Sequence, residues 1–397
     1  MPIPWLDSEL AAWREQGRWR RRRTCVPRGD GIVEVDGRTL LNLAGNDYLG
    51  LAGDPRLTEA AVEALEQAGV GARASALVSG RTDWHERLEQ RLAEFEHAEA
   101  AVLFPSGYAA NVGVISAVVG AQDAVFCDRL NHASLIDGCR LSRARLRVYR
   151  RPDLNELDDQ LRAERNRRRR LIVTDSVFSM DGDAAPLPDL ADLAERHDAL
   201  LLVDEAHATG VLGPGGRGLV ARFGIESDRC IRVGTLSKAL GSIGGFVVGG
   251  QGLADWLWNT ARTQVYSTAI PPAAAAAACA ALEIVAAEPQ RRERLLDASR
   301  SLRELLQSRG LRLPATDIPT PILPVIIGEE AATLAAAAEL ESRGLLVGAI
   351  RPPTVPAGAS RLRISLHSQI DGARLESIAD DVAAAAAVAC GGSRSGQ

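Results

Sequence analysis

The chain has 397 residues, of which 46% are hydrophobic and 24% charged, and its net charge is −5. This length allows two or three domains with a large core, and the negative charge argues against a dedicated nucleic-acid binder. No apolar leader or long uncharged apolar stretch indicates a membrane protein, and six scattered cysteines without a C-x-x-C pair indicate neither disulfides nor a metal site. We therefore expect a reduced, cytoplasmic protein.

Residues 1–50 are predicted to form an N-terminal helix followed by two short strands. The amphipathic pattern of the helix runs from position 6 to about position 23 and includes Trp13 and Trp19. The two strands, 32–35 and 39–42, are separated by Asp36-Gly37, a dipeptide typical of a hairpin turn.

Residues 51–288 alternate strand-like and helix-like segments and are predicted to form one large domain. Most of the strand segments are continuous apolar runs, which are typical of a parallel sheet covered by helices on both faces. The seven predicted strands are 101–104, 124–127, 146–149, 171–174, 200–203, 231–233 and 246–248.

Residues 289–390 are predicted to form a small α+β domain. An alanine-rich helix over 272–287 ends the large domain, and a highly charged helix over 290–309 begins the small one. The expected elements that follow are a strand at 322–327, a helix at 331–343, strands at 345–349 and 361–366, and a final helix. Residues 391–397 are predicted to be disordered.

Lys238 is the only lysine among the 46 basic residues of the chain. Arginine can replace lysine wherever a cation alone is needed. It cannot replace an amine that must lose its proton and attack a carbonyl, because the guanidinium does not deprotonate in proteins. The retained lysine is therefore a candidate for amine chemistry such as Schiff-base formation.

Other reactive side chains follow the predicted strands at their C-terminal ends, where ligands gather in open α/β sheets. Strand 200–203 runs into Asp204-Glu-Ala-His207, and strand 231–233 leads to Thr235 and Lys238. Strand 101–104 is followed by Pro105-Ser-Gly-Tyr108, which opens a helix whose free amides form an anion site. An amine, a carboxylate, histidines and a phosphate site are the groups that pyridoxal phosphate (PLP) requires.

Two other motif readings fail on their context. Asp204-Glu-Ala-His207 also occurs in nucleoside-triphosphate-driven helicases, but the required Walker A loop contains G-K-[ST], and the only lysine lies between Ser237 and Ala239. Gly213-Pro-Gly-Gly-Arg-Gly218 matches G-x-G-x-x-G, yet it lies well past its strand and contains a proline. A mobile glycine loop is the better interpretation of that segment.

A series of ordered motifs spans most of the chain. They are Asn46-Asp-Tyr-Leu-Gly-Leu51, Val78-Ser-Gly80, Phe104-Pro-Ser-Gly-Tyr108, Asp128-x-x-Asn-His-Ala-Ser134, Val177-Phe-Ser-Met-Asp-Gly-Asp183, Asp204-Glu-Ala-His-x-Thr-Gly210, Thr235-x-x-Lys238, Tyr266-Ser-Thr268, Arg351-Pro-Pro-Thr-Val-Pro356 and Arg361-x-Arg363. With these motifs the chain strongly resembles the α-oxoamine synthases, a family of fold-type I PLP enzymes. The resemblance implies an α/β fold-type I transferase, with a mostly parallel seven-stranded sheet in the large domain and a small C-terminal α+β domain.

The resemblance also implies a role for each matching position. Lys238 would form the imine with PLP, Asp204 would pair with the pyridine nitrogen, and His132 would stack on the ring. The remaining cofactor contacts would come from His207 and Ser179 near the ring hydroxyl, and from Gly107, Tyr108 and Thr235 around the phosphate. Ser267 or Thr268 would reach the phosphate of the neighbouring subunit, since family members are homodimers with active sites at the interface.

The implied reaction is a decarboxylating condensation of an amino acid with an acyl thioester. The stretch from Ala349 to Pro356 is most similar to the biotin-pathway branch, which joins L-alanine to a pimeloyl group carried by CoA or acyl-carrier protein. Arg363 would bind the amino-acid carboxylate, with Arg351 and Thr354 as nearby substrate contacts. Arg21 would meet the pimeloyl carboxylate, although the identical residues 20–23 allow the alignment to slip by one position.

Two alternatives remain open at this point. One is a sister synthase that uses glycine or serine with a different acyl thioester. The other is a non-catalytic, aminotransferase-like regulator that binds nucleic acid through its arginines. The latter would need a helix-turn-helix extension, for which about fifty residues before the core leave little room.

Overall fold

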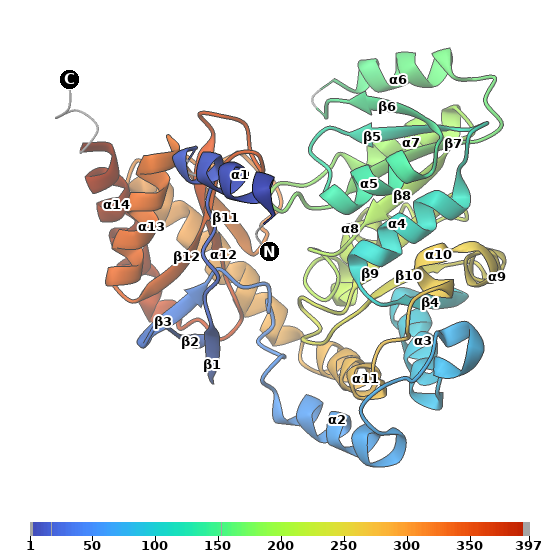
Figure 1. Cartoon of the computed structure of the whole chain (residues 1–397), viewed down its shortest axis with the longest axis horizontal. Helices are drawn as coiled ribbons and strands as arrows, with labels where there is room; N and C mark the ends of the chain where they lie inside the picture. Colours follow the sequence, from blue (N-terminus) through green and yellow to red (C-terminus); the bar gives the residue numbers. More distant parts are fainter. Residues whose placement is uncertain (1–2, 17, 152, 392–397) are drawn as a thin grey trace.

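A seven-stranded sheet forms the centre of the larger lobe (Figure 1). The computed structural model of the protein describes residues 3–16, 18–151 and 153–391. The strand order is β4-β10-β9-β8-β7-β5-β6, and β10 alone runs antiparallel to its neighbours. The strands are β4 (Ala100–Phe104), β5 (Ala124–Asp128), β6 (Arg145–Tyr149), β7 (Arg170–Asp175), β8 (Leu200–Asp204), β9 (Cys230–Thr235) and β10 (Gly245–Gly249). The predicted mostly parallel, seven-stranded sheet is confirmed.

Both faces of this sheet are buried, which explains the continuous apolar strands. Side chains alternate between two separate hydrophobic clusters, so that Ile172 joins one and Val173 the other, as do Leu201 and Leu202. The helices of this lobe are α2 (Pro55–Ala68), α3 (Asp83–Glu96), α4 (Gly107–Val118), α5 (Ala133–Leu141), α6 (Leu154–Ala163), α7 (Leu187–Arg196), α8 (Gly218–Phe223), α9 (Gln251–Thr260), α10 (Arg262–Val265) and α11 (Pro272–Ala287).

The smaller lobe is built from both ends of the chain. Its six-stranded sheet has the order β1-β2-β3-β12-β13-β11, and β3 pairs in parallel with β12. The strands are β1 (Cys25–Gly29), β2 (Ile32–Val35), β3 (Arg38–Leu43), β11 (Ile322–Gly328), β12 (Leu345–Ile350) and β13 (Ser360–Ser365), and helices α12 (Pro289–Ser308), α13 (Glu330–Ser342) and α14 (Leu375–Gly391) belong to the same lobe (Figure 1). The domain boundaries at 50, 288 and 390 stay a proposal, although the N-terminal strands share this sheet with the C-terminal ones.

The hairpin between β2 and β3 follows its sequence signal. Asp36 and Gly37 have φ angles of 51° and 78°, which are the left-handed conformations that a tight hairpin turn of this kind requires.

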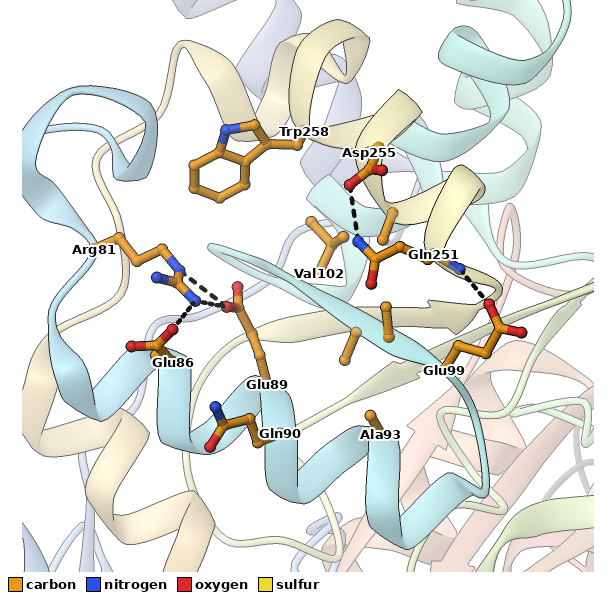
Figure 2. A pocket seen from close by; sticks show the side chains of 13 residues that line it. Arg81, Glu86, Glu89, Gln90, Ala93, Glu99, Val102, Gln251, Asp255 and Trp258 are labelled. Carbon is orange, nitrogen blue, oxygen red and sulfur yellow. Dashed lines mark hydrogen bonds and ion pairs between the residues drawn. The ribbon is translucent and has the colours of Figure 1, made fainter.

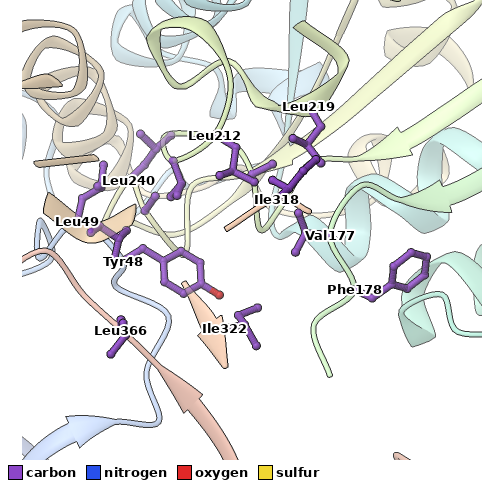
Figure 3. Close-up of a cluster of buried hydrophobic side chains, with 14 of the residues drawn as sticks. Tyr48, Leu49, Val177, Phe178, Leu212, Leu219, Leu240, Ile318, Ile322 and Leu366 are labelled. Carbon is purple, nitrogen blue, oxygen red and sulfur yellow. The ribbon is translucent and has the colours of Figure 1, made fainter. Parts of the chain in front are cut away.

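The buried side chains of Tyr48, Leu49 and Leu366 fill the junction between this lobe and the larger one (Figure 3).

The prediction for the N-terminal helix is wrong about where the helix ends. Helix α1 covers Pro4–Glu15 rather than 6–23, and residues 18–24 have no helical structure. Helix α1 buries no side chain, so little packing supports its extension into a run of four like charges. Arg23 instead binds the small lobe, with Nη1 2.6 Å from Oε2 of Glu341 and Nε 3.0 Å from Oδ2 of Asp36.

Helix α14 ends at Gly391, and the rest of the predicted disordered tail, 392–397, lies outside the described residues. Within the described ranges, no single helix is long and apolar enough to cross a membrane. The helices α11 and α12 reach that length and hydropathy only when joined, and they meet at a bend of 75°.

Candidate active site

The carboxyl ends of β7, β8 and β9 bring Asp175, Asp204 and Lys238 to one edge of the larger sheet. Asp175 lies opposite Asp204 in the parallel register of β7 and β8, and Lys238 follows the end of β9 by three residues. Both carboxyl side chains are buried. This is the edge at which the sequence predicted the site.

The amine of Lys238 lies 2.8 Å from Nε2 of His207. Burial lowers the pKa of Lys238 to about 8, although the carboxylates of Asp204 and Asp175 oppose that shift. An amine with this pKa is partly neutral near pH 7.5, which a nucleophile or a general base requires.

His207 is held from its other side by Tyr48. The Tyr48 hydroxyl lies 2.6 Å from Nδ1 of His207, and both side chains are buried. Burial and the positive charges of Lys238 and Arg363 lower the pKa of His207 well below its ordinary value. His207 is therefore a neutral imidazole with a fixed ring position.

Asp204 is fixed by two hydrogen-bond donors. Nδ2 of Asn111 lies 2.6 Å from its Oδ2, and the amide of Ala206 donates to its Oδ1 at 2.8 Å. The same Asn111 amide donates to the Ser134 hydroxyl at 2.9 Å, and that hydroxyl lies 2.7 Å from Nδ1 of His132. Hydrogen bonds therefore link the carboxylate to the imidazole of His132.

Asp175 positions His132 through the backbone. Its Oδ2 accepts from the His132 amide at 2.7 Å, at the start of α5. Burial and the nearby charge of Asp204 raise the pKa of Asp175 well above its ordinary value. Burial also lowers the pKa of His132, which favours a neutral ring at this position.

The first turn of α4 forms an anion site. Ser106 caps the helix by accepting from the Ala109 amide, while the amides of Gly107 and Tyr108 have no acceptor in the part of the chain that the structure describes. Thr235 packs directly against Gly107, because an added Cβ there would lie 3.3 Å from the Thr235 hydroxyl oxygen. Two free amides and a hydroxyl thus converge at a helix N-terminus.

The other predicted site residues divide into two groups. The buried side chain of Arg363 on β13 donates to the Ser179 carbonyl at 2.6 Å, to the Ser365 hydroxyl at 2.8 Å and to Oδ1 of Asn46 at 3.2 Å. This brings the small lobe to the site.

The second group lies outside that network. Thr354 is exposed in the loop after β12, where its amide donates to the Arg351 carbonyl, and Thr268 is exposed in a bridge with Ser75. Arg21 is exposed beyond α1. Among the described residues, no hydrogen bond or ion pair joins Arg21, Thr268 or Thr354 to Lys238, Asp204 or His207.

Sequence reasoning missed the functional importance of Tyr48 and Asn111. One signal was available for Asn111, because it is a single amide in an apolar helical segment, four residues after Gly107 and therefore on the same helix face.

A separate surface cavity of about 440 Å³ lies at the outer edge of β4 and does not include Lys238 (Figure 2). In it Arg81 pairs with Glu89 at 2.8 Å and with Glu86 at 3.5 Å, and Trp258 lies opposite. These charges are satisfied by each other.

The groups at the strand ends fit PLP. The side-chain amine of Lys238 is half-buried and partly neutral, the Asp204 carboxylate is fixed by amide donors, and the start of α4 offers two amides without acceptors among the described residues. In bound PLP these groups would meet the aldehyde carbon, the pyridine nitrogen and the phosphate respectively. A model of the family "Aminotransferase class I and II" matches residues 38–382, so the chain belongs to that family of fold-type I, PLP-dependent enzymes.

More similar proteins narrow this class. The 8-amino-7-oxononanoate synthase of Anaeromyxobacter dehalogenans is 50% identical over 374 residues, which cover 94% of each chain. The solved structure of that synthase from Francisella tularensis is 30% identical with a TM-score of 0.75, covering 87% of this chain and 97% of that one. A structure of SPT with PLP is also 30% identical, with a TM-score of 0.90 and 97% of each chain covered. The chain belongs to the 8-amino-7-oxononanoate synthases, the biotin-pathway acyltransferases.

Proposed function

We propose that this enzyme condenses L-alanine with a pimeloyl thioester to give 8-amino-7-oxononanoate, CO2 and the free thiol carrier. The observation that carries the proposal is the half-buried, partly neutral amine of Lys238, which lies 2.8 Å from Nε2 of His207 and feels the charges of the Asp204 and Asp175 carboxylates. The 50% identity to synthases of that name supports the choice of substrates.

Bound PLP supplies an electron sink for negative charge that develops at Cα of the amino acid. When PLP is bound, Asp204 would keep the pyridine nitrogen protonated, and the amides of Gly107 and Tyr108, with the Thr235 hydroxyl, would hold the phosphate. Lys238 removes the Cα proton through its Nζ. Its pKa of about 8 supports that role, because proton transfer is efficient when the base titrates near the working pH.

The remaining predicted cofactor contacts, His132, His207 and Ser179, belong to the same proposal. His132 lies at the start of α5, where Ser134 and Asp175 fix its ring and its backbone. His207 is oriented by Tyr48, and the Ser179 carbonyl is already used by Arg363.

Substrate recognition falls to arginines. The three hydrogen bonds of Arg363 leave N–H groups on both terminal nitrogens for the alanine carboxylate. Arg351 and Thr354 lie in a neighbouring loop as further contacts. Arg23 is occupied by Glu341 and Asp36, which supports Arg21 as the residue that binds the distal carboxylate of the pimeloyl group.

A homodimer with active sites at the interface is part of the proposal. Thr268 is exposed and forms a backbone bridge with Ser75. Two large side chains in these segments are also exposed: Tyr266, two residues before Thr268, is 72% exposed, and Val78, three residues after Ser75, is 78% exposed. Surfaces of this kind are typical of protein contacts. A second subunit would cover them and would place Thr268 at the phosphate of its partner. The cytoplasmic location likewise stays a proposal.

The test is CO2 release with each combination of alanine, glycine or serine and pimeloyl, acetyl or palmitoyl thioesters. We expect alanine with pimeloyl thioester to give the highest kcat/KM. A preference for glycine with acetyl-CoA, or for serine with palmitoyl-CoA, would overturn the proposal in favour of a sister synthase. Running the pimeloyl arm with CoA and with acyl-carrier protein identifies the carrier.

A further inference from the structure

A buried chain of hydrogen bonds runs from Arg363 in the small lobe to Lys238 in the large one. Nη2 of Arg363 lies 3.2 Å from Oδ1 of Asn46, and the Tyr48 hydroxyl lies 3.2 Å from the same oxygen. The hydroxyl is 2.6 Å from Nδ1 of His207, whose Nε2 is 2.8 Å from the Lys238 amine. Tyr48 is 1% exposed and belongs to the same buried hydrophobic cluster as Leu49, Leu240 and Leu366 (Figure 3).

The direction of each hydrogen bond follows from which groups can only donate. The guanidinium of Arg363 can donate hydrogen bonds but cannot accept them, so the Asn46 atom that faces it is the amide oxygen. That oxygen can only accept, and therefore the Tyr48 hydroxyl donates its single proton to Asn46. The Tyr48 oxygen then accepts from Nδ1–H of His207.

The neutral ring of His207 carries one proton, and the chain places it on Nδ1. Nε2 consequently presents a lone pair to Lys238 and accepts a hydrogen bond from its amine. If the proton were on Nε2 instead, that ring nitrogen would face the protonated amine with a hydrogen, and the contact would be repulsive.

We propose that Tyr48 is a positioning residue, which together with Asn46 holds His207 in the tautomer whose Nε2 accepts from the Lys238 amine. The proposal deepens the assigned chemistry and rests on Lys238 as the reactive amine. It does not depend on the choice of amino acid or thioester. The other charged or titratable groups that act on the amine are Asp204, Asp175, Arg363 and His132, and the variants below leave all four in place.

The sole lysine makes the test direct. In protein labelled with 13C-lysine, Lys238 gives the only lysine side-chain signal, so its Cε shift followed against pH reports one pKa. The full chain is purified as the holoenzyme and then freed of PLP for the titration. In parallel, 15N-histidine spectra report the tautomer of His207, whose signal is assigned by its loss in His207→Gln.

In Tyr48→Phe, Nδ1 of His207 loses its acceptor and the Nδ1–H tautomer is no longer favoured. We expect a mixed tautomer and a fall in the Lys238 pKa of about one unit, because the buried ammonium loses a hydrogen-bond acceptor. Tyr149→Phe is the matched control. Tyr149 is also fully buried, but its hydroxyl has no hydrogen-bond partner among the described residues, so neither signal should change.

Asn46→Ala keeps the proposal falsifiable if Tyr48→Phe fails to fold. Without the Asn46 oxygen, the Tyr48 hydroxyl donates to Nδ1 of His207 and moves the ring proton to Nε2, so the tautomer should reverse. A wild-type tautomer and a wild-type Lys238 titration in either folded variant would overturn the proposal. Because no substrate is present, this outcome is distinct from a failure of the proposed substrates.

Discussion

Replacing Lys238 by arginine preserves the charge and removes the chemistry. With a pKa of about 8, about a quarter of the Lys238 side chains are neutral at pH 7.5. An exposed lysine with an ordinary pKa would be neutral in only about one molecule in a thousand at that pH. Burial thus raises the reactive fraction more than a hundredfold, whereas the arginine of Lys238→Arg stays protonated throughout.

The assay is borohydride reduction of the holoenzyme, followed by peptide mapping and by a measurement of CO2 release. Wild-type protein should carry one PLP-derived label, on the peptide that contains Lys238, because no other lysine is present. Lys238→Arg should carry no label, and its kcat should fall by at least about a hundredfold through loss of the general base.

Arg129→Lys is the matched control for this experiment. It introduces a second, exposed lysine after β5, outside the hydrogen-bonded group around His207. The label should remain confined to Lys238 in that variant. Turnover retained in Lys238→Arg, or a label on the new lysine in place of Lys238, would refute the reasoning from burial and amine chemistry.

Two further predictions concern stability. Gly234→Ala should destabilise the fold by about 1–3 kcal/mol in urea unfolding, since the added Cβ would come 2.2 Å from Cζ of Phe246. The control is Gly252→Ala on α9, where the added Cβ would meet nothing within 4 Å, and this variant should be neutral or stabilising. Equal changes in the unfolding free energy of the two variants would contradict the packing argument. Burial lowers the pKa of His367 to about 4 from 6.5, so the unfolded chain binds the proton first and stability is lost as the pH falls from 6.5 to 4, by up to about 3 kcal/mol. His367→Phe should remove that loss, and an unchanged acid sensitivity of the unfolding free energy would exclude His367 as its source.

The elements of the fold were predictable wherever the signal is local. Short apolar segments, several of them continuous apolar runs, predicted all seven strands of the larger sheet, and Asp36-Gly37 predicted the hairpin between β2 and β3. The pairing of β3 with β12 joins segments about three hundred positions apart in the sequence, and no local pattern encodes it. The end of α1 at Glu15 was not predictable from the amphipathic pattern either, because the helix buries no side chain and Arg23 is held by Glu341 on the distant helix α13.

Some features of the candidate site were likewise predictable from the sequence, and others were not. Asp204 and Lys238 were predictable because parallel strands bring their carboxyl ends to a common edge, whatever the details of packing. The hydrogen bond between Tyr48 and His207 was not, since it joins residues 159 positions apart through the junction of the two lobes. Its geometry depends on how the small lobe packs, which the residue types alone do not specify.

The contrast between Lys238 and the arginines follows from what each position requires of its charge. Arg232 is buried against Glu96, with Nη1 2.7 Å from the backbone carbonyl and 3.2 Å from Oε2, and this contact needs only a hydrogen-bond donor with a positive charge, which arginine supplies. At Lys238 burial disfavours the cation, and the carboxylates of Asp204 and Asp175 favour it. The balance leaves the amine able to gain and lose a proton near neutral pH, which an arginine at that position could not do. A chain that uses arginine for every other basic residue must therefore keep lysine here.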